Sequence, residues 1–422
     1  MKPMRRLNVQ TENGARYCQP MMRAPRALFS VFAVFTVLAL AAPAQAGPRV
    51  YENEEQGSWV DLGILVEAQY RLDNVQNGPT DHNIWLRRLR PTISGGFNED
   101  WQAILQIDFG AGATGLDYSV TVRWVNMQYV GVKNSHLTMG SFKNWFSREF
   151  VTLGPQLQFV ERTFVGENTY GNPAYTIGVG WDHTVANDRI FYAANIGVQN
   201  ASSLASDMAF RSPANGDSTD NKGWSAAARV DFYALGRAIY DKAPLGYKLT
   251  PYDRSDINDT KDWLLSFSVG GFAWWNQGNN NGLCADVDPT LCTDLQNAGG
   301  VEASGGVRGY GLSADFEYQF VRGNTVDDTY TGGLYQDGRT SLHKATVNAG
   351  YMVIAKHFEL VAGWSILSAS NFANPWNRAI AGLNGFVKGY NIRFSADYVR
   401  EIKILGTALN GNVFRVQAQF TW

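Results

Sequence analysis

The last eleven residues of the chain, 412–422, alternate strictly between apolar and polar side chains from position 414 onward. Successive side chains of a β-strand point to opposite faces, so this pattern predicts a strand with one wholly apolar face. The apolar positions are Phe414, Val416, Ala418, Phe420 and Trp422. A strand of this length with aromatic ends is typical of a membrane-spanning β-barrel, although soluble sandwiches also contain alternating strands.

The same alternation recurs along the chain and predicts fifteen clear strands. They cover residues 59–71, 85–97, 101–109, 120–129, 137–142, 175–181, 189–199, 224–232, 263–269, 310–320, 344–354, 358–367, 379–387, 390–399 and 412–422. Both chain ends lie on the same side of a barrel only if the number of strands is even. The alternation of strand direction slips between residues 275 and 310, and a glycine-rich strand at 298–307 restores it. We therefore expect an all-β fold, a transmembrane antiparallel β-barrel of sixteen strands.

The connections between these strands alternate in length. Short ones are 131–135, 185–188, 356–357 and 388–389, and long ones are 143–173, 200–222, 277–297 and 322–342. Short turns at one end and long extracellular loops at the other are typical of outer-membrane barrels, and a soluble sandwich has no reason to sort its loops this way. Segment 235–262 is long but falls among the short turns. It is either a periplasmic insertion or a sign that the strand phase is wrong there.

Residues 1–46 are expected to form a secretory signal peptide. Arg23 and Arg26 precede a largely apolar run at 28–42, and an Ala-x-Ala triplet ends at Ala46. A positive flank, an apolar core and a small-residue cleavage site together distinguish a signal peptide from a membrane helix. An amino-terminal anchor helix is the alternative, but the apolar run is short for a bilayer.

The expected mature domain, an outer-membrane barrel over residues 47–422, is mildly acidic. The leader removes six of the 36 basic residues and one of the 38 acidic residues, which leaves a net charge of −7. This charge argues against a nucleic-acid partner. No apolar run near 18 residues follows the leader, and aromatic residues make up 13% of the chain, as expected for a barrel with aromatic girdles. Met21 or Met22 is an alternative start, because the stretch before them is long and polar for a leader.

Two cysteines remain after the leader, which takes Cys18 with it. Cys284 and Cys292 share one polar loop, and in an oxidising compartment we expect them to form a local disulfide. Their spacing is too long for a redox motif. No further His or Cys lies near enough to complete a metal site.

The sharpest candidate site is the arginine cluster at 87–90. Arg88 and Arg90 share the expected lumen face about 7 Å apart, whereas Arg87 falls on the other face. Guanidinium groups bind oxyanions bidentately and keep their charge, so stacked arginines could pass an anion along. The alternative is that they pair with Asp108 or Glu67 and only brace the wall.

A second candidate is the loop 143–173, which contains Lys143, Arg148 and Arg162. If it folds inward it narrows the pore, and if it stays outside it is a surface loop. Arg415 of the last strand is also expected to face the lumen.

These residues lie in segments that resemble the phosphate-selective porin family, of the outer-membrane porin O and P type. The segments are 87–90 (RRLR), 97–101 (FNEDW), 106–109 (QIDF), 140–143 (GSFK), 146, 161–162, 350–351, 356–360 and 415–420 (RVQAQF). The resemblance implies a sixteen-stranded, usually trimeric channel whose basic lumen residues draw anions through. Arg88, Arg90 and Lys143 match its motif positions. It also implies that Trp422 ends a strand recognised by the barrel-assembly machinery.

We therefore expect a passive outer-membrane porin of a Gram-negative bacterium, with a preference for phosphate or other small anions. Its expected partners are small hydrophilic solutes, outer-membrane lipid and two further copies of itself, with no cofactor. A general or cation-preferring porin and a plugged, adhesive barrel are alternatives. A barrel enzyme such as a lipase is a third, but the five histidines are scattered and none sits in a nucleophile motif.

Overall fold

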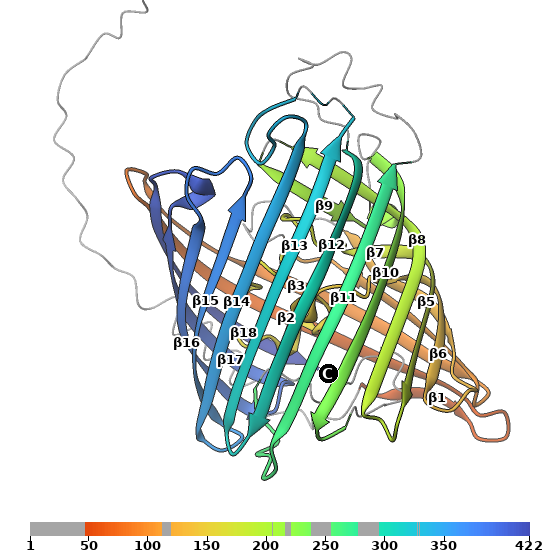
Figure 1. The fold of residues 1–422 in the computed structure, drawn as a ribbon. Helices are drawn as coiled ribbons and strands as arrows, with labels where there is room; N and C mark the ends of the chain where they lie inside the picture. The colour runs from red at the N-terminus through yellow and green to blue at the C-terminus, as the bar shows by residue number, and fades with distance from the viewer. Residues whose placement is uncertain are drawn as a thin grey trace, which may run out of the picture. The chain divides into compact units, whose positions relative to one another are not determined.

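Alternating strands build a closed barrel in the computed structural model (Figure 1). The structure describes residues 47–111, 120–204, 206–215, 221–237, 255–276, 295–326, 328 and 330–422. The predicted leader at 1–46 and the predicted disulfide between Cys284 and Cys292 lie outside the described residues. In the part of the chain that is described, no helix is long and apolar enough to cross a membrane.

Sixteen antiparallel strands form the wall within the described ranges. They are β2 (Ser58–Val75), β3 (Thr80–Phe97), β4 (Trp101–Asp108), β5 (Thr121–Tyr129), β6 (Ser135–Lys143), β7 (Tyr175–Val185), β8 (Ile190–Leu204), β10 (Asn221–Leu235), β11 (Leu264–Asn276), β12 (Leu295–Gly309), β13 (Leu312–Thr325), β14 (Arg339–Ile354), β15 (Phe358–Ala369), β16 (Trp376–Lys388), β17 (Ile392–Ile402) and β18 (Asn410–Thr421). The predicted strand at 298–307 is β12. The expected fold and strand count are confirmed.

The barrel closes where the last strand meets the first. β18 pairs with β2 over Thr421↔Leu65 to Gly411↔Val75, and the two ends are fixed by reciprocal backbone bonds of 2.9 Å between Ile64 and Trp422. Two short strands are additions to the wall: β1 (Arg49–Asn53) pairs with the start of β2, and β9 (Asp207–Arg211) pairs with the end of β8. Closure leaves no free edge between β2 and β18, as a membrane-spanning sheet requires.

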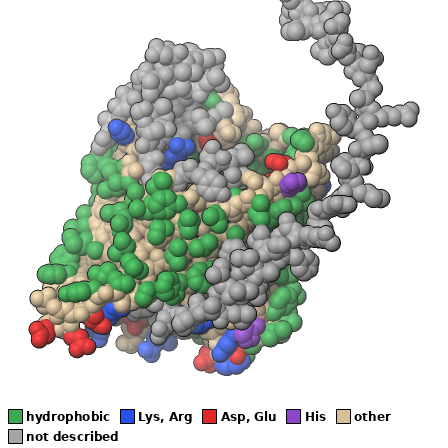
Figure 2. Space-filling model, turned by 180° about the vertical axis from the view of Figure 1, so that it is seen from behind, with side chains coloured by type: hydrophobic (Ala, Val, Ile, Leu, Met, Phe, Trp, Pro, Cys, Tyr) green, Lys and Arg blue, Asp and Glu red, His purple; other side chains and the backbone are tan. Residues whose placement is uncertain are grey.

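The two faces of the wall differ as the alternation predicts. On β13, Phe316 and Tyr318 are exposed on the outer face, while Asp315 and Glu317 are buried inside. The same sorting spreads hydrophobic side chains over the outer wall in Figure 2. An outer face of this kind suits lipid, because lipid offers no hydrogen bonds to polar groups.

One connection is much longer than the other turns at its end of the barrel. The segment between β10 and β11 leaves at the short-turn end, so the strand phase holds and the segment is an insertion. Its described end returns against the barrel: Ser255 Oγ donates to Glu359 at 2.8 Å, and Ile257 packs on Met352 and Phe386.

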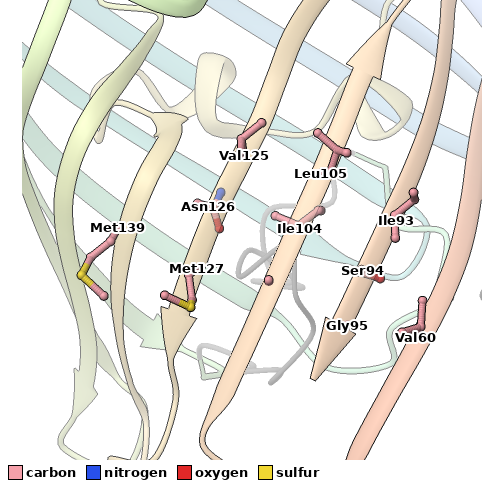
Figure 3. A pocket seen from close by; sticks show the side chains of 11 residues that line it. Val60, Ile93, Ser94, Gly95, Ile104, Leu105, Val125, Asn126, Met127 and Met139 are labelled. Atoms are coloured by element: carbon pink, nitrogen blue, oxygen red, sulfur yellow. The ribbon is translucent and has the colours of Figure 1, made fainter. Parts of the chain in front are cut away.

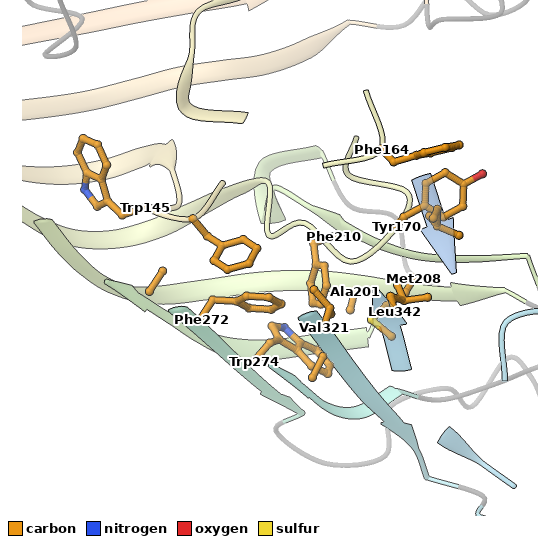
Figure 4. Packing of buried hydrophobic residues seen from close by; sticks show 14 of the residues in the cluster. Trp145, Phe164, Tyr170, Ala201, Met208, Phe210, Phe272, Trp274, Val321 and Leu342 are labelled. Atoms are coloured by element: carbon orange, nitrogen blue, oxygen red, sulfur yellow. The ribbon is translucent and has the colours of Figure 1, made fainter. Parts of the chain in front are cut away.

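The inside of the barrel also holds an apolar cluster at its long-loop end. Trp274 and Phe272 of β11 belong to one cluster with Met208 of β9 and with Phe146 and Phe164 of the loop after β6, and the rings of Phe146 and Phe272 lie 4.7 Å apart. Figure 4 shows part of this cluster. These side chains fill part of the lumen. Any aqueous path must therefore run beside them.

Candidate functional site

The loop after β6, residues 144–174, folds into the barrel. Most of its residues are buried and the others are half-buried, and it contains one short helix, α2 (Arg148–Val151). Ser147 begins this helix as its cap, since its Oγ accepts from Phe150 N at 3.0 Å. The question of where this loop lies, which the sequence left open, is thereby answered: it lies inside the lumen.

Carboxylates of the wall hold the loop in place. Glu302 on β12 accepts from Arg148 N at 3.1 Å, and Glu317 on β13 accepts from Glu149 N at 2.8 Å. Further along, Asp397 on β17 accepts from Val160 N at 3.0 Å. Charged acceptors make strong hydrogen bonds to backbone N–H groups. The acidic residues of these strands therefore act as supports for the loop.

A cavity of about 770 Å³ remains between this loop and strands β2 to β5. Trp422 lines it at the short-turn end, and Asn168, whose side chain donates to Phe210 O of β9, lines it toward the long-loop end. The charged residues that line it are the cations Arg87, Arg88, Arg90, Arg123, Lys143 and Arg162 and the carboxylates Asp61, Glu161 and Glu167. Six cations against three carboxylates give the lining residues a formal charge of +3, which Glu67 and Asp108, paired with Arg88, Arg90 and Arg123, reduce to +1.

Two of these cations reach the cavity because their strands are bulged. Glu67 pairs with Arg88 and the next residue, Ala68, pairs with Leu86, which leaves Arg87 as an extra residue in β3. A β-bulge of this kind puts two consecutive side chains on one face. The expectation that Arg87 lies on the other face is wrong for this reason.

Arg123 is the extra residue of a second bulge. Gln106 pairs with Trp124 and Ile107 pairs with Val122, so Arg123 has no residue opposite it on β4. Sequence reasoning missed Arg123 altogether. The only signal available was the weak alternation of residues 120–129.

The arginines of β3 and β5 are paired with carboxylates. Arg90 Nε lies 2.8 Å from Asp108 and Arg123 lies 3.3 Å from the same carboxylate, while Arg88 pairs with Glu67. Arg90 and Arg123 keep 13% and 30% of their side-chain surface exposed. Both interpretations of the cluster thus describe it: the arginines brace the wall and also line the cavity.

Arg87 is paired with the loop itself, through Glu161 Oε1 at 2.5 Å. Burial raises the pKa of Glu161, but Arg87 and Arg88 outweigh it and hold that pKa well below its usual range. Glu161 therefore stays charged, and the cavity side of the loop stays tied to β3.

Lys143 and Arg162 converge on the end of helix α2. Lys143 Nζ donates to Phe150 O at 2.8 Å and to Thr152 O at 3.2 Å, and Arg162 donates to Thr152 O at 2.8 Å. Burial, with Arg88 as a second cause, lowers the pKa of Arg162 to about 10. Both side chains thus bind neutral carbonyl oxygens here, and not carboxylates.

Two other sequence candidates lie away from the cavity lining. Arg148 crosses to the opposite wall, where it donates to Ser266 Oγ at 2.9 Å and lies 3.1 Å from Asp315. Arg415 faces the lumen as expected, but it forms a two-pronged pair with Asp397 at 2.7 and 2.8 Å. The structure brings together Arg88, Arg90, Lys143 and Arg162, and separates these two from them.

A second, shallow cavity of about 590 Å³ lies over the wall formed by β2 to β6 (Figure 3). Val60, Ile93, Leu105, Val125 and Met127 line it, and its chemistry is apolar. The strands β4, β5 and β6 beneath it have 8, 9 and 9 residues. It offers no group suited to catalysis or metal binding.

Comparison with known proteins gives one family and a consistent fold. The sequence model of the phosphate-selective porins O and P matches residues 60–276. No curated protein sequence matches the chain.

Among solved structures, the anion-selective porin of Comamonas acidovorans is 9% identical, with 86% of this chain and 100% of that one covered and a TM-score of 0.53. The outer-membrane protein OmpT of Vibrio cholerae is 13% identical (89% and 100% covered, TM-score 0.54). The outer-membrane channel DcaP of Acinetobacter baumannii is 11% identical (90% and 100% covered, TM-score 0.51). At such identities the likeness concerns the fold alone.

Proposed function

Because the chain belongs to the phosphate-selective porin O and P family, we propose that the cavity beside the folded loop is its selective passage. The protein is a passive outer-membrane porin, a channel rather than an enzyme. The passage prefers small anions, phosphate among them, and its anion-binding residues are Arg87, Arg88, Arg90, Arg123, Lys143 and Arg162.

The excess of positive charge in the cavity lining is the observation that carries this proposal. In a narrow cleft with low-dielectric walls, charges of one sign raise the local concentration of counter-ions. The six cations gather on β3, β5, the end of β6 and the loop, whereas the supporting carboxylates of β12, β13 and β17 are turned to the loop backbone. An acidic chain can therefore have a basic passage.

Planar-bilayer recording tests this proposal. Purified protein in a KCl gradient near neutral pH should show a reversal potential with the sign set by chloride. A reversal potential set by potassium would overturn the anion preference and favour a general or cation-preferring porin. Complete absence of conductance would favour a plugged barrel.

The subunit arrangement is also part of this proposal. We propose a homotrimer whose subunits meet at the apolar wall of β4 to β6. A spanning strand needs about 9–11 residues, so strands of 8 and 9 residues lie at or below the lower limit for a wall that faces lipid. A neighbouring copy would cover Leu105, Val125 and Met127 instead.

The orientation follows from the sorted loops, which support a periplasmic short-turn end and extracellular long loops in a Gram-negative bacterium. The aromatic end of β18 supports recognition by the barrel-assembly machinery. A Cys284–Cys292 disulfide and a cleaved leader at 1–46 remain part of this proposal.

A further inference from the structure

Two arginines lie together on the outer face of the wall, at the long-loop end of β13 and β14. Asn324 pairs with Arg339 in the register of these strands, and Arg322 lies two residues before Asn324, so the arginines are diagonal neighbours. Val321 and Thr340, next to them along the chain, are buried inside the barrel, whereas both arginines are exposed. Diagonal neighbours on one face of a sheet lie about 7–8 Å apart, so both guanidinium groups can reach one ligand.

No carboxylate holds this pair. Unlike the arginines of the passage, neither Arg322 nor Arg339 forms an ion pair within the described part of the chain. The connection between β13 and β14 packs Leu334 and Tyr335 into the buried cluster inside the barrel, and both arginines keep their outer side exposed. Two positive groups therefore face the surroundings of the barrel at its long-loop end.

Aromatic side chains lie next to the pair, on the side nearer the middle of the wall. Tyr318 and Phe320 precede Arg322 on the outer face of β13. The hydroxyl of Tyr318 lies 2.8 Å from Nδ1 of His343 on β14, and the rings of Phe320 and His343 have centroids 5.0 Å apart. Aromatic girdles mark the two boundaries of the apolar band of a membrane barrel. The arginines therefore lie just outside that band, at the height of lipid headgroups.

The strands β13 and β14 lie on the side of the barrel away from the proposed subunit contact. In the described wall, seven strands separate β14 from β5 in either direction, so the two are opposite each other. A trimer that meets at β4 to β6 leaves β13 and β14 facing the membrane. With the long loops outside the cell, the two arginines meet the outer leaflet.

We propose that Arg322 and Arg339 form a binding site for a phosphorylated glycolipid of the outer leaflet, of the lipid A type. The planar guanidinium groups bind a phosphate of its sugar headgroup in two-pronged geometry. Asn324 and Ser341 share this face and offer hydrogen bonds to the sugar hydroxyls, while Phe320 packs against the acyl chains. This inference goes beyond the proposed channel function and rests on the orientation and subunit contact proposed with it.

Native mass spectrometry of the purified protein tests the site. Wild type is titrated with bisphosphorylated lipid A, with lipid A that lacks both phosphates, and with phosphatidylglycerol. We expect the bisphosphorylated lipid to bind most tightly. The double variant Arg322→Gln/Arg339→Gln should bind it about tenfold more weakly, because it loses charge-assisted hydrogen bonds.

Arg400→Gln is the matched control. Arg400 also follows an outward tyrosine, Tyr398, at the long-loop end of a wall strand, but it donates to Asn412 Oδ1 at 2.9 Å. The residues opposite it on the two neighbouring strands are Ala379 and Asn412, so no second arginine lies opposite it. We expect this variant to bind lipid A as wild type does. All three arginines lie outside the cavity lining, so every variant should keep the chloride selectivity of wild type, which also verifies that its barrel is folded.

Equal binding of lipid A with and without its phosphates overturns this site, and so does an equal loss of binding in Arg400→Gln. Phosphatidylglycerol that binds as tightly as bisphosphorylated lipid A overturns the assignment to a glycolipid. A potassium-selective channel whose double variant loses lipid A supports this inference, although it overturns the proposed anion preference.

Discussion

At the scale of single residues, the charge of the passage depends on where two strands break their alternation. Arg88 and Arg90 follow the period of two and could be predicted as lumen residues from the sequence. Arg87 and Arg123 could not, because each is the extra residue of a bulge and a bulge leaves no periodic signature. Half of the arginine cluster on β3 and β5 was therefore hidden from sequence reasoning.

Arg123→Gln should weaken anion selectivity. Its side chain is 30% exposed in the cavity, and Arg90 remains to hold Asp108 when it is removed. We expect the chloride-to-potassium permeability ratio to fall by roughly two- to fivefold, as one partly screened charge contributes about 0.5–1 kcal/mol. Lys261→Gln, which removes an exposed cation outside the cavity, is the control and should leave the ratio unchanged.

Glu161→Gln should have the opposite effect, since it removes a negative charge from the lining and leaves Arg87 without its carboxylate. The chloride-to-potassium ratio should rise near neutral pH. Because the folded-state pKa of Glu161 lies below its usual value, its ion pair is present above the unfolded pKa and is lost only when the pH falls through the lower, folded value.

The difference between wild type and Glu161→Gln should therefore persist at about pH 4, near the ordinary pKa of a glutamate. Reversal potentials at both pH values measure it. Wild-type selectivity that converges on that of the variant at about pH 4 would show that Glu161 titrates in the ordinary range.

At the scale of elements, the inward loop is the feature that the sequence left undecided. Its contacts join positions more than 150 residues apart, such as Arg148 with Glu302 and Glu149 with Glu317. The loop composition mixes aromatic and charged residues and suits either a packed or an exposed segment. The partners that decide the matter are polar lumen residues of distant strands, which sequence alternation identifies as inward but cannot match to the loop.

Arg148→Ala should release this loop from the far wall. The side chain lies 3.1 Å from Asp315 inside the barrel and donates to Ser266 Oγ, so its removal takes away both of these contacts between the loop and the far wall. We expect a larger and noisier single-channel conductance, with little change in ion preference because Arg148 does not line the cavity. Single-channel recordings provide the measurement.

Arg308→Ala is the matched control for that experiment. Arg308 lies 2.5 Å from the other oxygen of Asp315 but belongs to the wall strand β12. The Arg308→Ala substitution therefore removes a partner of the same carboxylate and leaves the residues of the loop unchanged. Equal noise in both variants would mean that the wall, and not the loop, responds.

At the scale of the whole molecule, the barrel was predictable because lipid imposes a simple rule on every strand. Outward side chains must be apolar, so Phe316 and Val347 could be placed from alternation alone, and the sixteenth strand followed from the phase. The lumen obeys no such rule. Trp274 and Phe272 point inward to an apolar cluster, and alternation alone does not predict that part of the lumen is filled.

The proposed subunit contact also belongs to this scale. Met127 lies on the short-strand wall and Val347 on a 16-residue strand, and both are exposed on the outer face. With Cys284 and Cys292 replaced by serine, Met127→Cys should yield covalent dimers with a short bifunctional maleimide, whereas Val347→Cys should not. Denaturing gel electrophoresis provides the measurement, and equal cross-linking of both variants would remove the contact from this wall.

The two bulges have a consequence for how such a channel can diversify. Removing Arg87 or Arg123 as a whole residue would rejoin a regular ladder, and every other side chain of the strand would keep its face. Pore charge here can therefore change by the gain or loss of a single codon, without any substitution on the surface that meets the membrane. The ion preference of this barrel can therefore evolve through the number of residues in β3 and β5.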